Sequence, residues 1–183
     1  MKSLRLVGGG VHAHACIDVV EAEGAFTIQG IVERTEGNHA PVLAHSYIGN
    51  DGDLARLLAT APSALVMAGQ VKTGVDRVAL YARLVELGAN MPIVISPMIY
   101  VSRHPSVDDG TTITHGGIIN VIASIAHHCH ISTGARVNIG SGTFIGGGAV
   151  PREGVRVGAN CVVRAGAIAL HDLPDSSKYL GMP

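Results

Sequence analysis

The 183-residue sequence has few aromatic residues and little charge, and each shortage limits what the protein can be. Aromatic side chains make up 3% of the residues and Trp is absent, so the core must be filled by small aliphatic side chains, as in a narrow interior. Charged residues make up only 15%, which predicts that another subunit covers part of the surface. The formal net charge of -1 argues against nucleic-acid binding, which requires a basic face.

Cysteines and long apolar segments are also scarce. Three cysteines do not make a disulfide framework. Cys129 and Cys161 fall on positions expected to face a core, and Cys16 lies in a predicted helix, so we interpret all three as small core residues. No apolar segment is long enough for a signal peptide or a membrane span. We therefore expect a cytoplasmic protein that does not enter a membrane.

What the sequence does contain is an aliphatic anchor at every sixth position from Val101 to Ala169, with one interruption. A small or modest side chain stands four residues after each anchor. A period of six is typical of a parallel β-helix, in which each hexad forms one flat side and three hexads close a triangular coil. The run predicts between three and four coils. The six-residue spacing is interrupted between Asn138 and Ile139, where we expect the chain to lack a few residues of a full coil. The anchors are Val101, Val107, Ile113, Ile119, Ile125, Ile131 and Val137, then Ile139, Ile145, Pro151, Val157, Val163 and Ala169.

The first hundred residues have a different pattern. Apolar strands are predicted at 3–7, 26–34, 63–70 and 91–97, and helices at 11–24, 51–61 and 75–89. In the last helix the apolar residues stand at 75, 78, 79, 82, 85 and 87. Strands that alternate with helices predict a small Rossmann-like parallel sheet with crossover helices. We therefore expect two domains: an α/β domain over residues 1–97 and an all-β domain, the β-helix, over residues 98–183.

A glycine-rich turn joins the first strand to the first helix. Gly8, Gly10 and Ala13 fit the loose G-x-G-x-x-G/A pattern, and Glu33 ends the next strand. Such a turn can seat a nucleotide diphosphate on the amino terminus of a helix. The alternative is a tight turn without a ligand. His12 lies beside the turn, where a histidine can either cap the helix or touch a ligand.

Three histidines stand close together in "IAHHCHIS". In the hexad frame His127 and His128 face outward at a corner, and His130 directly precedes the anchor Ile131. Outward imidazoles on a rigid coil can act as general bases near neutral pH, bind a metal, or simply be solvated. The residues alone leave these three alternatives open.

The chain as a whole resembles the NeuD/PglD-type bacterial sugar acetyltransferases. The resemblance rests on "LVGGGVHA", "VMAGQVK", "SPMIYVSRHPSV", "HHCHISTGA", "GTFIGGGAV", "GVRVGANCVV" and "HDLPDSSKYLGMP". It implies a trimer with a left-handed β-helix that moves acetyl from acetyl-CoA to an aminosugar nucleotide or to a sialic-acid-like sugar in surface-glycan synthesis. It also implies that the α/β domain holds the sugar nucleotide and that acetyl-CoA lies along the β-helix between two subunits, with no metal required.

The resemblance also assigns roles to individual residues. The hexad "IAHHC" has the form of the family's catalytic hexad, which makes His127 the expected base, although His128 replaces an acid there. The chain is one coil shorter than the family pattern before this hexad. Arg34 likewise departs from the family's acidic pair. The implied sugar-nucleotide contacts are Gly10, Val11, His12, Glu33, Arg34 and Gly69, and the implied acetyl-CoA contacts are His130, Gly147 and Ala165.

Two other functions remain open on sequence grounds. A zinc hydratase of the γ-carbonic-anhydrase type is also a trimeric β-helix and holds its metal with histidines. Such an enzyme does not need the α/β domain, which counts against it. The other alternative is a non-catalytic member of the family that binds the sugar nucleotide but lost its chemistry with the missing coil.

Overall fold

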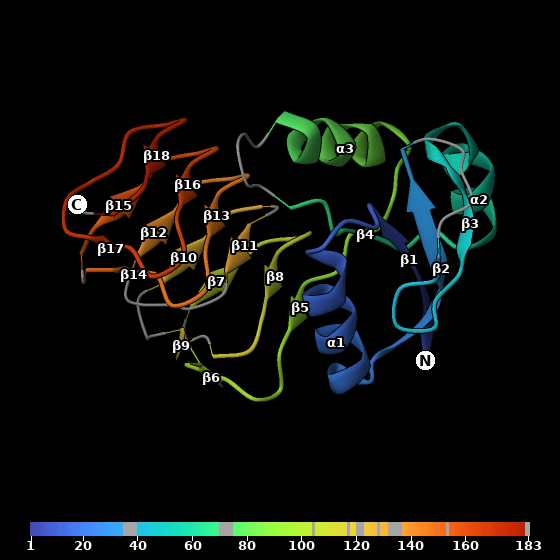
Figure 1. Cartoon of the computed structure of the whole chain (residues 1–183), viewed down its shortest axis with the longest axis horizontal. Coiled ribbons are helices and arrows are strands. Elements are labelled where there is room, and N and C mark those ends of the chain that lie inside the picture. Colours follow the sequence, from blue (N-terminus) through green and yellow to red (C-terminus); the bar gives the residue numbers. More distant parts are fainter. Residues whose placement is uncertain are drawn as a thin grey trace. The chain divides into compact units, whose positions relative to one another are not determined.

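The chain forms two compact units, Met1–Gly69 with Val75–Pro92, and Ile93–Pro183 (Figure 1). The computed structural model describes residues 1–34, 40–69, 75–103, 105–116, 118–119, 123–127, 129–131, 137–152 and 154–181. Within these residues, no helix is long and apolar enough to cross a membrane.

The first unit is built on a four-stranded parallel sheet in the order β3-β2-β1-β4. Its interior is aliphatic, with Leu4, Leu6 and Ile31 fully buried. Helix α1 connects β1 to β2, η1 and α2 connect β3 to β4, and α3 follows β4. Figure 1 labels the three α-helices. The elements are β1 (Lys2–Val7), α1 (Ala13–Glu23), β2 (Phe26–Glu33), β3 (Tyr47–Asn50), the 3-10 helix η1 (Asp51–Asp53), α2 (Leu54–Thr60), β4 (Ala64–Val66) and α3 (Val75–Glu86).

Most of these elements agree with the sequence prediction. Helix α1 ends as expected at Gly24, which adopts the left-handed conformation (φ 68°) that favours glycine. Strand β3 was not predicted, because it is short and all four of its residues are only half-buried, so it has no alternating pattern. Helix α3 is present, but the face that its apolar spacing predicted to be buried is wrong. Val75 and Val85 are exposed, while Leu84 is buried.

The second unit is a three-sided parallel β-helix. Its first face contains β7, β10, β12 and β15, its second face β5, β8, β11, β13, β16 and β18, and its third face the pairs β6–β9 and β14–β17. The strands are β5 (Val94–Ile95), β6 (Tyr100–Val101), β7 (Ser106–Val107), β8 (Thr112–Ile113), β9 (Ile118–Ile119), β10 (Ser124–Ile125), β11 (His130–Ile131), β12 (Asn138–Ile139), β13 (Phe144–Ile145), β14 (Val150–Pro151), β15 (Arg156–Val157), β16 (Val162–Val163), β17 (Ile168–Ala169) and β18 (Lys178–Tyr179).

The hexad anchors end these strands and fill the core, as predicted. Ile113, Ile131, Ile145 and Val163 have no exposed surface. The small residues four positions after an anchor are buried as well at Thr111, Ala123, Cys129, Thr143, Ala149, Val155, Cys161 and Ala167. The β-helix is longer than the predicted three to four coils. The second face has six strands, because β5 and β18, which lie outside the hexad run, add one strand at each end.

The six-residue spacing is interrupted, as predicted, but the interruption does not lie between Asn138 and Ile139. Asn138 and Ile139 are consecutive residues of β12, and Asn138 pairs with Ser124, fourteen positions away instead of the usual eighteen. The missing residues therefore precede Asn138. Val137 is buried, yet it is not an anchor: its carbonyl accepts from the Ser124 amide at 3.1 Å, as the Ala123 carbonyl accepts from Ser106 one coil earlier.

A column of threonine and cysteine side chains stabilises the first corner, where the first face turns into the second. Thr143 Oγ1 donates to the carbonyl of Gly158 at 2.7 Å and accepts from the amide of Cys161 at 3.0 Å. Thr111 makes the same pair of bonds two coils earlier, to Ala126 and Cys129. The two cysteines are buried, as expected, and each thiol donates to a carbonyl of the next coil, Gly140 for Cys129 and Pro174 for Cys161. These cysteines are therefore hydrogen-bonding residues as well as core residues.

Candidate active site

The glycine turn after β1 is held tightly at its first two residues and is open at the third. Gly8 has a φ of 97°, and a Cβ there would lie 3.0 Å from the amide nitrogen of Ala68. A Cβ on Gly9 would collide with the ring of Tyr47. A Cβ on Gly10 would meet no atom within 4 Å, and Val11 is 92% exposed. Gly10 thus leaves open space beside the amino terminus of α1.

Glu33, at the carboxyl end of β2, organises this turn. Its Oε2 accepts from the amide of Gly9 at 2.7 Å, and its Oε1 accepts from the amide of Arg34 at 2.9 Å. The Arg34 guanidinium lies on the surface, 3.1 Å from Asp76 at the start of α3. Burial and the nearby Glu33 carboxylate both raise the pKa of Asp51, which follows β3 at the same edge of the sheet. Negative charge therefore accumulates where β2 and β3 end.

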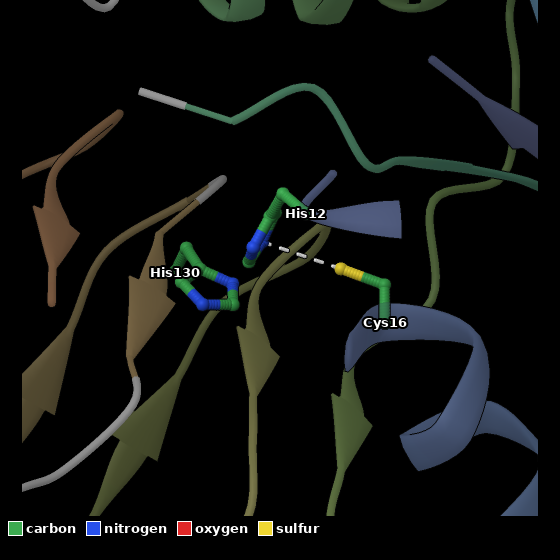
Figure 2. A group of neighbouring side chains, drawn as sticks. All are labelled: His12, Cys16 and His130. Carbon is green, nitrogen blue, oxygen red and sulfur yellow. Dashed lines mark hydrogen bonds between the residues drawn. The ribbon is translucent and has the colours of Figure 1, made fainter. Parts of the chain in front are cut away.

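His12 precedes α1 without capping it. Its side chain makes no capping hydrogen bond, and its Nε2 lies 3.4 Å from Sγ of Cys16, one turn along α1 (Figure 2). Burial, helped by the positive charge of Arg77, lowers the pKa of His12 to about 4, so the imidazole is neutral at physiological pH. Burial raises the pKa of Cys16 to about 12. Gly69 is brought to the same place, since a Cβ there would lie 3.1 Å from Cβ of His12.

Arg77 is a residue of this region that the sequence did not predict. It lies in the first turn of α3 and is completely buried. Its Nη1 donates to the carbonyls of Val66 and Ala68, at 3.2 and 3.1 Å, so it fixes the chain as it leaves β4. The sequence feature that could have predicted its burial is an arginine among apolar residues, but such an arginine is more often exposed to solvent.

In the second unit, His127 and His130 have different surroundings. His127 lies at the first corner, just after β10, with 54% of its side chain exposed and Nε2 3.6 Å from Oδ2 of Asp108. His130 lies on β11 of the second face, is completely buried, and stacks on Phe144 of the next coil with ring centroids 5.0 Å apart (its ring is also drawn in Figure 2). His128 lies outside the described residues.

Gly147 and Ala165 lie together at the second corner, where the second face turns into the third. They occupy equivalent positions of successive coils, and the carbonyl of Gly147 accepts from the amide of Gly166 at 2.9 Å. Ala165 lines a pocket of about 370 Å³ together with Arg164, Ile168 and Leu180. A larger groove of about 570 Å³ lies over the first face and contains none of the predicted site residues.

The predicted residues of the β-helix are thus only partly brought together within one chain. Gly147 and Ala165 follow second-face strands, whereas His127 precedes one. They therefore stand at opposite edges of the same face, and His130 lies between these edges. A site that used both His127 and the Gly147 corner of a single chain would have to span that face.

The whole chain is similar in structure to bacterial sugar acetyltransferases. Perosamine N-acetyltransferase from Caulobacter crescentus, a histidine variant crystallised with CoA and GDP-perosamine, is 25% identical, with a TM-score of 0.76 over 100% of this chain and 95% of that one. The acetyltransferase domain of PglB from Neisseria gonorrhoeae, in complex with acetyl coenzyme A, is 25% identical, with a TM-score of 0.66 over 97% and 95%. These neighbours are hexapeptide-repeat bacterial sugar acetyltransferases, which fits the NeuD/PglD-type resemblance inferred from the sequence.

WeeI from Acinetobacter baumannii shares the fold at 16% identity, with a TM-score of 0.60 over 97% of this chain and 96% of that one. Neither a protein-family model nor a curated protein matches the sequence. The similarity to sugar acetyltransferases therefore rests on the fold together with the shared motifs. It confirms the resemblance inferred from the sequence.

Proposed function

We propose that this protein transfers the acetyl group of acetyl-CoA to the amine of an aminosugar nucleotide, in the cytoplasm, as a step of surface-glycan synthesis. The observation that carries this proposal is the match over the whole chain, both units included, to an enzyme crystallised with CoA and GDP-perosamine. A sialic-acid-like acceptor is the less favoured substrate, because the related structure with an acceptor bound holds a nucleotide-linked aminosugar.

We assign the sugar nucleotide to the first unit, as the Rossmann-like domain expected over residues 1–97, of which residues 93–97 belong to the second unit. The strand order β3-β2-β1-β4 is the first half of a doubly wound sheet, whose ligands bind at the carboxyl ends of the strands. Gly10, Val11 and His12 stand at that edge, before the amino terminus of α1, where backbone amides attract phosphate. Glu33, Arg34 and Gly69 complete the proposed contacts. The open space at Gly10 supports a close approach of the diphosphate.

We assign the chemistry to residues 98–183, as a left-handed β-helix. Nε2 of His127 faces Asp108, which favours the tautomer with its proton on Nε2 and leaves the lone pair on Nδ1. Nδ1 takes a proton from the acceptor amine as its nitrogen attacks the thioester carbonyl. The tetrahedral oxyanion is stabilised by backbone N–H groups of a coil. When it collapses, the C–S bond breaks and the CoA thiolate takes the proton from His127. His130, Gly147 and Ala165 bind the coenzyme.

The positions of these residues favour a homotrimer. His127 and the Gly147 corner stand at opposite edges of one face, so side-by-side packing can bring the His127 corner of one chain to the Gly147 corner of the next. The low charge content agrees with such covered surfaces. Sedimentation velocity should give the mass of a trimer at micromolar concentration. A stable, active monomer would contradict this assembly.

The function is tested by incubating the purified protein with acetyl-CoA and a panel of GDP- and UDP-linked aminosugars. We expect free CoA thiol to appear together with an acetylated sugar nucleotide, detected by its mass. Binding of both ligands without transfer would instead indicate a non-catalytic member of the family. Stoichiometric zinc together with carbon dioxide hydration would favour the hydratase.

A further inference from the structure

His115 breaks the residue pattern of the second corner. It stands two positions after the anchor Ile113, in the same column of equivalent positions as Gly147 and Ala165. At the other positions of this column that the structure describes, the side chain has no hydrogen-bond donor; they are Pro97, Gly147, Ala165 and Gly181. Among the described residues of the column, His115 alone therefore carries a polar side chain, which is half-buried.

A buried serine orients this imidazole. Ser96, which directly follows β5 and is 2% exposed, has its Oγ 2.6 Å from Nδ1 of His115. The same Oγ accepts from the amide of Met98 at 3.1 Å. These two groups are the partners of the hydroxyl within the described part of the chain. Since an amide N–H cannot accept, the hydroxyl proton is donated to Nδ1. The proton of the neutral imidazole then stands on Nε2, which is a hydrogen-bond donor.

The height of His115 along the β-helix determines which part of the coenzyme it meets. Packing about a three-fold axis parallel to the β-helices keeps every residue at its own height. Successive coils are about 4.8 Å apart, so His115, which precedes His127 by two of the three sides of a coil, lies about 3 Å from it in height. Gly147 follows His127 by one coil and one side, which places it about 6 Å away in the opposite direction. A thioester that reacts at the height of His127 therefore lies between His115 and Gly147.

We propose that Nε2–H of His115 donates to the carbonyl oxygen of the acetyl thioester that faces His127 of the partner subunit, and that Ser96 positions the imidazole. This inference rests on the proposed function and adds a catalytic residue to it. When the acceptor nitrogen attacks, negative charge builds up on that oxygen. A fixed donor stabilises this charge more in the transition state than in the bound substrate. His115 keeps its proton throughout, because the proton of the amine goes to His127.

The test compares His115→Ala with wild type by the release of CoA thiol. We expect kcat to fall by about 10²- to 10³-fold, the usual effect of losing one oxyanion donor, with a nearly constant KM for acetyl-CoA. CoA itself lacks the acetyl carbonyl, so its affinity in calorimetry should stay as in wild type. His115→Gln, whose amide N–H stands near the position of Nε2, should recover part of kcat. His171→Ala is the matched control and should keep full kcat, since His171 holds the same hexad position at the corner after β17.

Ser96→Ala tests the positioning role. Without the hydroxyl, either tautomer of His115 forms, so kcat should fall by about two- to tenfold while the KM for acetyl-CoA stays constant. A residue that served the fold alone would lower the melting temperature and leave kcat as in wild type. That result would overturn the role of Ser96.

The remaining outcomes separate this inference from the proposed function. If His115→Ala keeps kcat, or raises only the KM for acetyl-CoA, the assignment of His115 is wrong while acetyl transfer stands. If His115→Ala loses the sedimenting mass of wild type, His115→Gln and Ser96→Ala decide, and wild-type turnover in both would overturn the inference. If wild type transfers no acetyl group, the proposed function fails and this inference fails with it.

Discussion

Replacing His127 tests the proposed chemistry most directly. His127→Asn removes the base while keeping a polar side chain of similar size at an exposed corner, so the fold should not change. We expect kcat to fall by about 10²- to 10⁴-fold, the usual contribution of a general base. The KM for acetyl-CoA should stay nearly constant, because the base acts mainly in the transition state.

The surroundings of His127 also set the effect expected at Asp108. The two side chains are 54% and 46% exposed and 3.6 Å apart, so their interaction is screened by solvent and contributes about 0–1 kcal/mol. Asp108→Asn should therefore lower kcat by no more than about fivefold. A loss as large as that of His127→Asn would mean that Asp108 is shielded from water in the assembled enzyme and orients the ring.

The assay follows release of CoA thiol with a thiol-reactive dye at saturating acetyl-CoA, and His130→Ala serves as the comparison. Since we assign His130 to coenzyme binding, His130→Ala should mainly raise the KM for acetyl-CoA. The reasoning is refuted if His127→Asn keeps full turnover. It is also refuted if His130→Ala abolishes kcat while His127→Asn changes only KM, which would move the base to His130.

Three further changes probe the individual units. Gly10→Val should weaken sugar-nucleotide binding in calorimetry without lowering the free energy of unfolding, since a Cβ there meets no protein atom; equal loss of CoA binding would contradict this. Thr143→Val leaves the buried amide of Cys161 without its acceptor, so urea unfolding should show a loss of about 1–3 kcal/mol, and an unchanged midpoint would count against the bond. The pKa of His12 is about 4 when folded and near 6.5 when unfolded, so the unfolded state binds more protons between these values. Stability should therefore fall by about 2 kcal/mol from pH 7.5 to 4.5, and His12→Asn should remove this loss unless another group causes it.

The β-helix could be predicted from the sequence because its rule is local. Every anchor contributes one buried side chain to one narrow core, so a simple repeat of aliphatic residues specifies strand, corner and interior together. The strands at the two ends of the second face were harder to assign. β5 lies within the strand predicted at 91–97, and Ile95 stands six positions before Val101, but the prediction placed this strand in the α/β domain, whereas it pairs with β8 of the β-helix. β18 was not predicted, because Tyr179 does not continue the six-residue spacing from Ala169, and its pairing with β16 reveals it.

The first unit shows what such patterns cannot predict. The buried face of α3 is determined by Arg77, whose guanidinium satisfies two carbonyls at the end of β4. A prediction from apolar spacing treats arginine as an exposed residue. It therefore assigned Val75 and Val85 to the buried face of the helix. Likewise, the motif identified the glycine turn but not the different roles of its residues: Gly8 and Gly9 are needed by the fold, and only Gly10 is free for a ligand.

The shortened coil bears on whether the protein keeps its activity. The missing residues fall between Ile131 and Asn138, because the pairs on both sides of this segment are fourteen positions apart. The pairs Ser124–Asn138 and His130–Phe144 keep both faces in register across the break. The first corner, with His127, and the second corner, with Gly147, border these faces. Each corner therefore keeps its position from coil to coil. The first and second faces, which carry His127 and His130, are therefore continuous across the break.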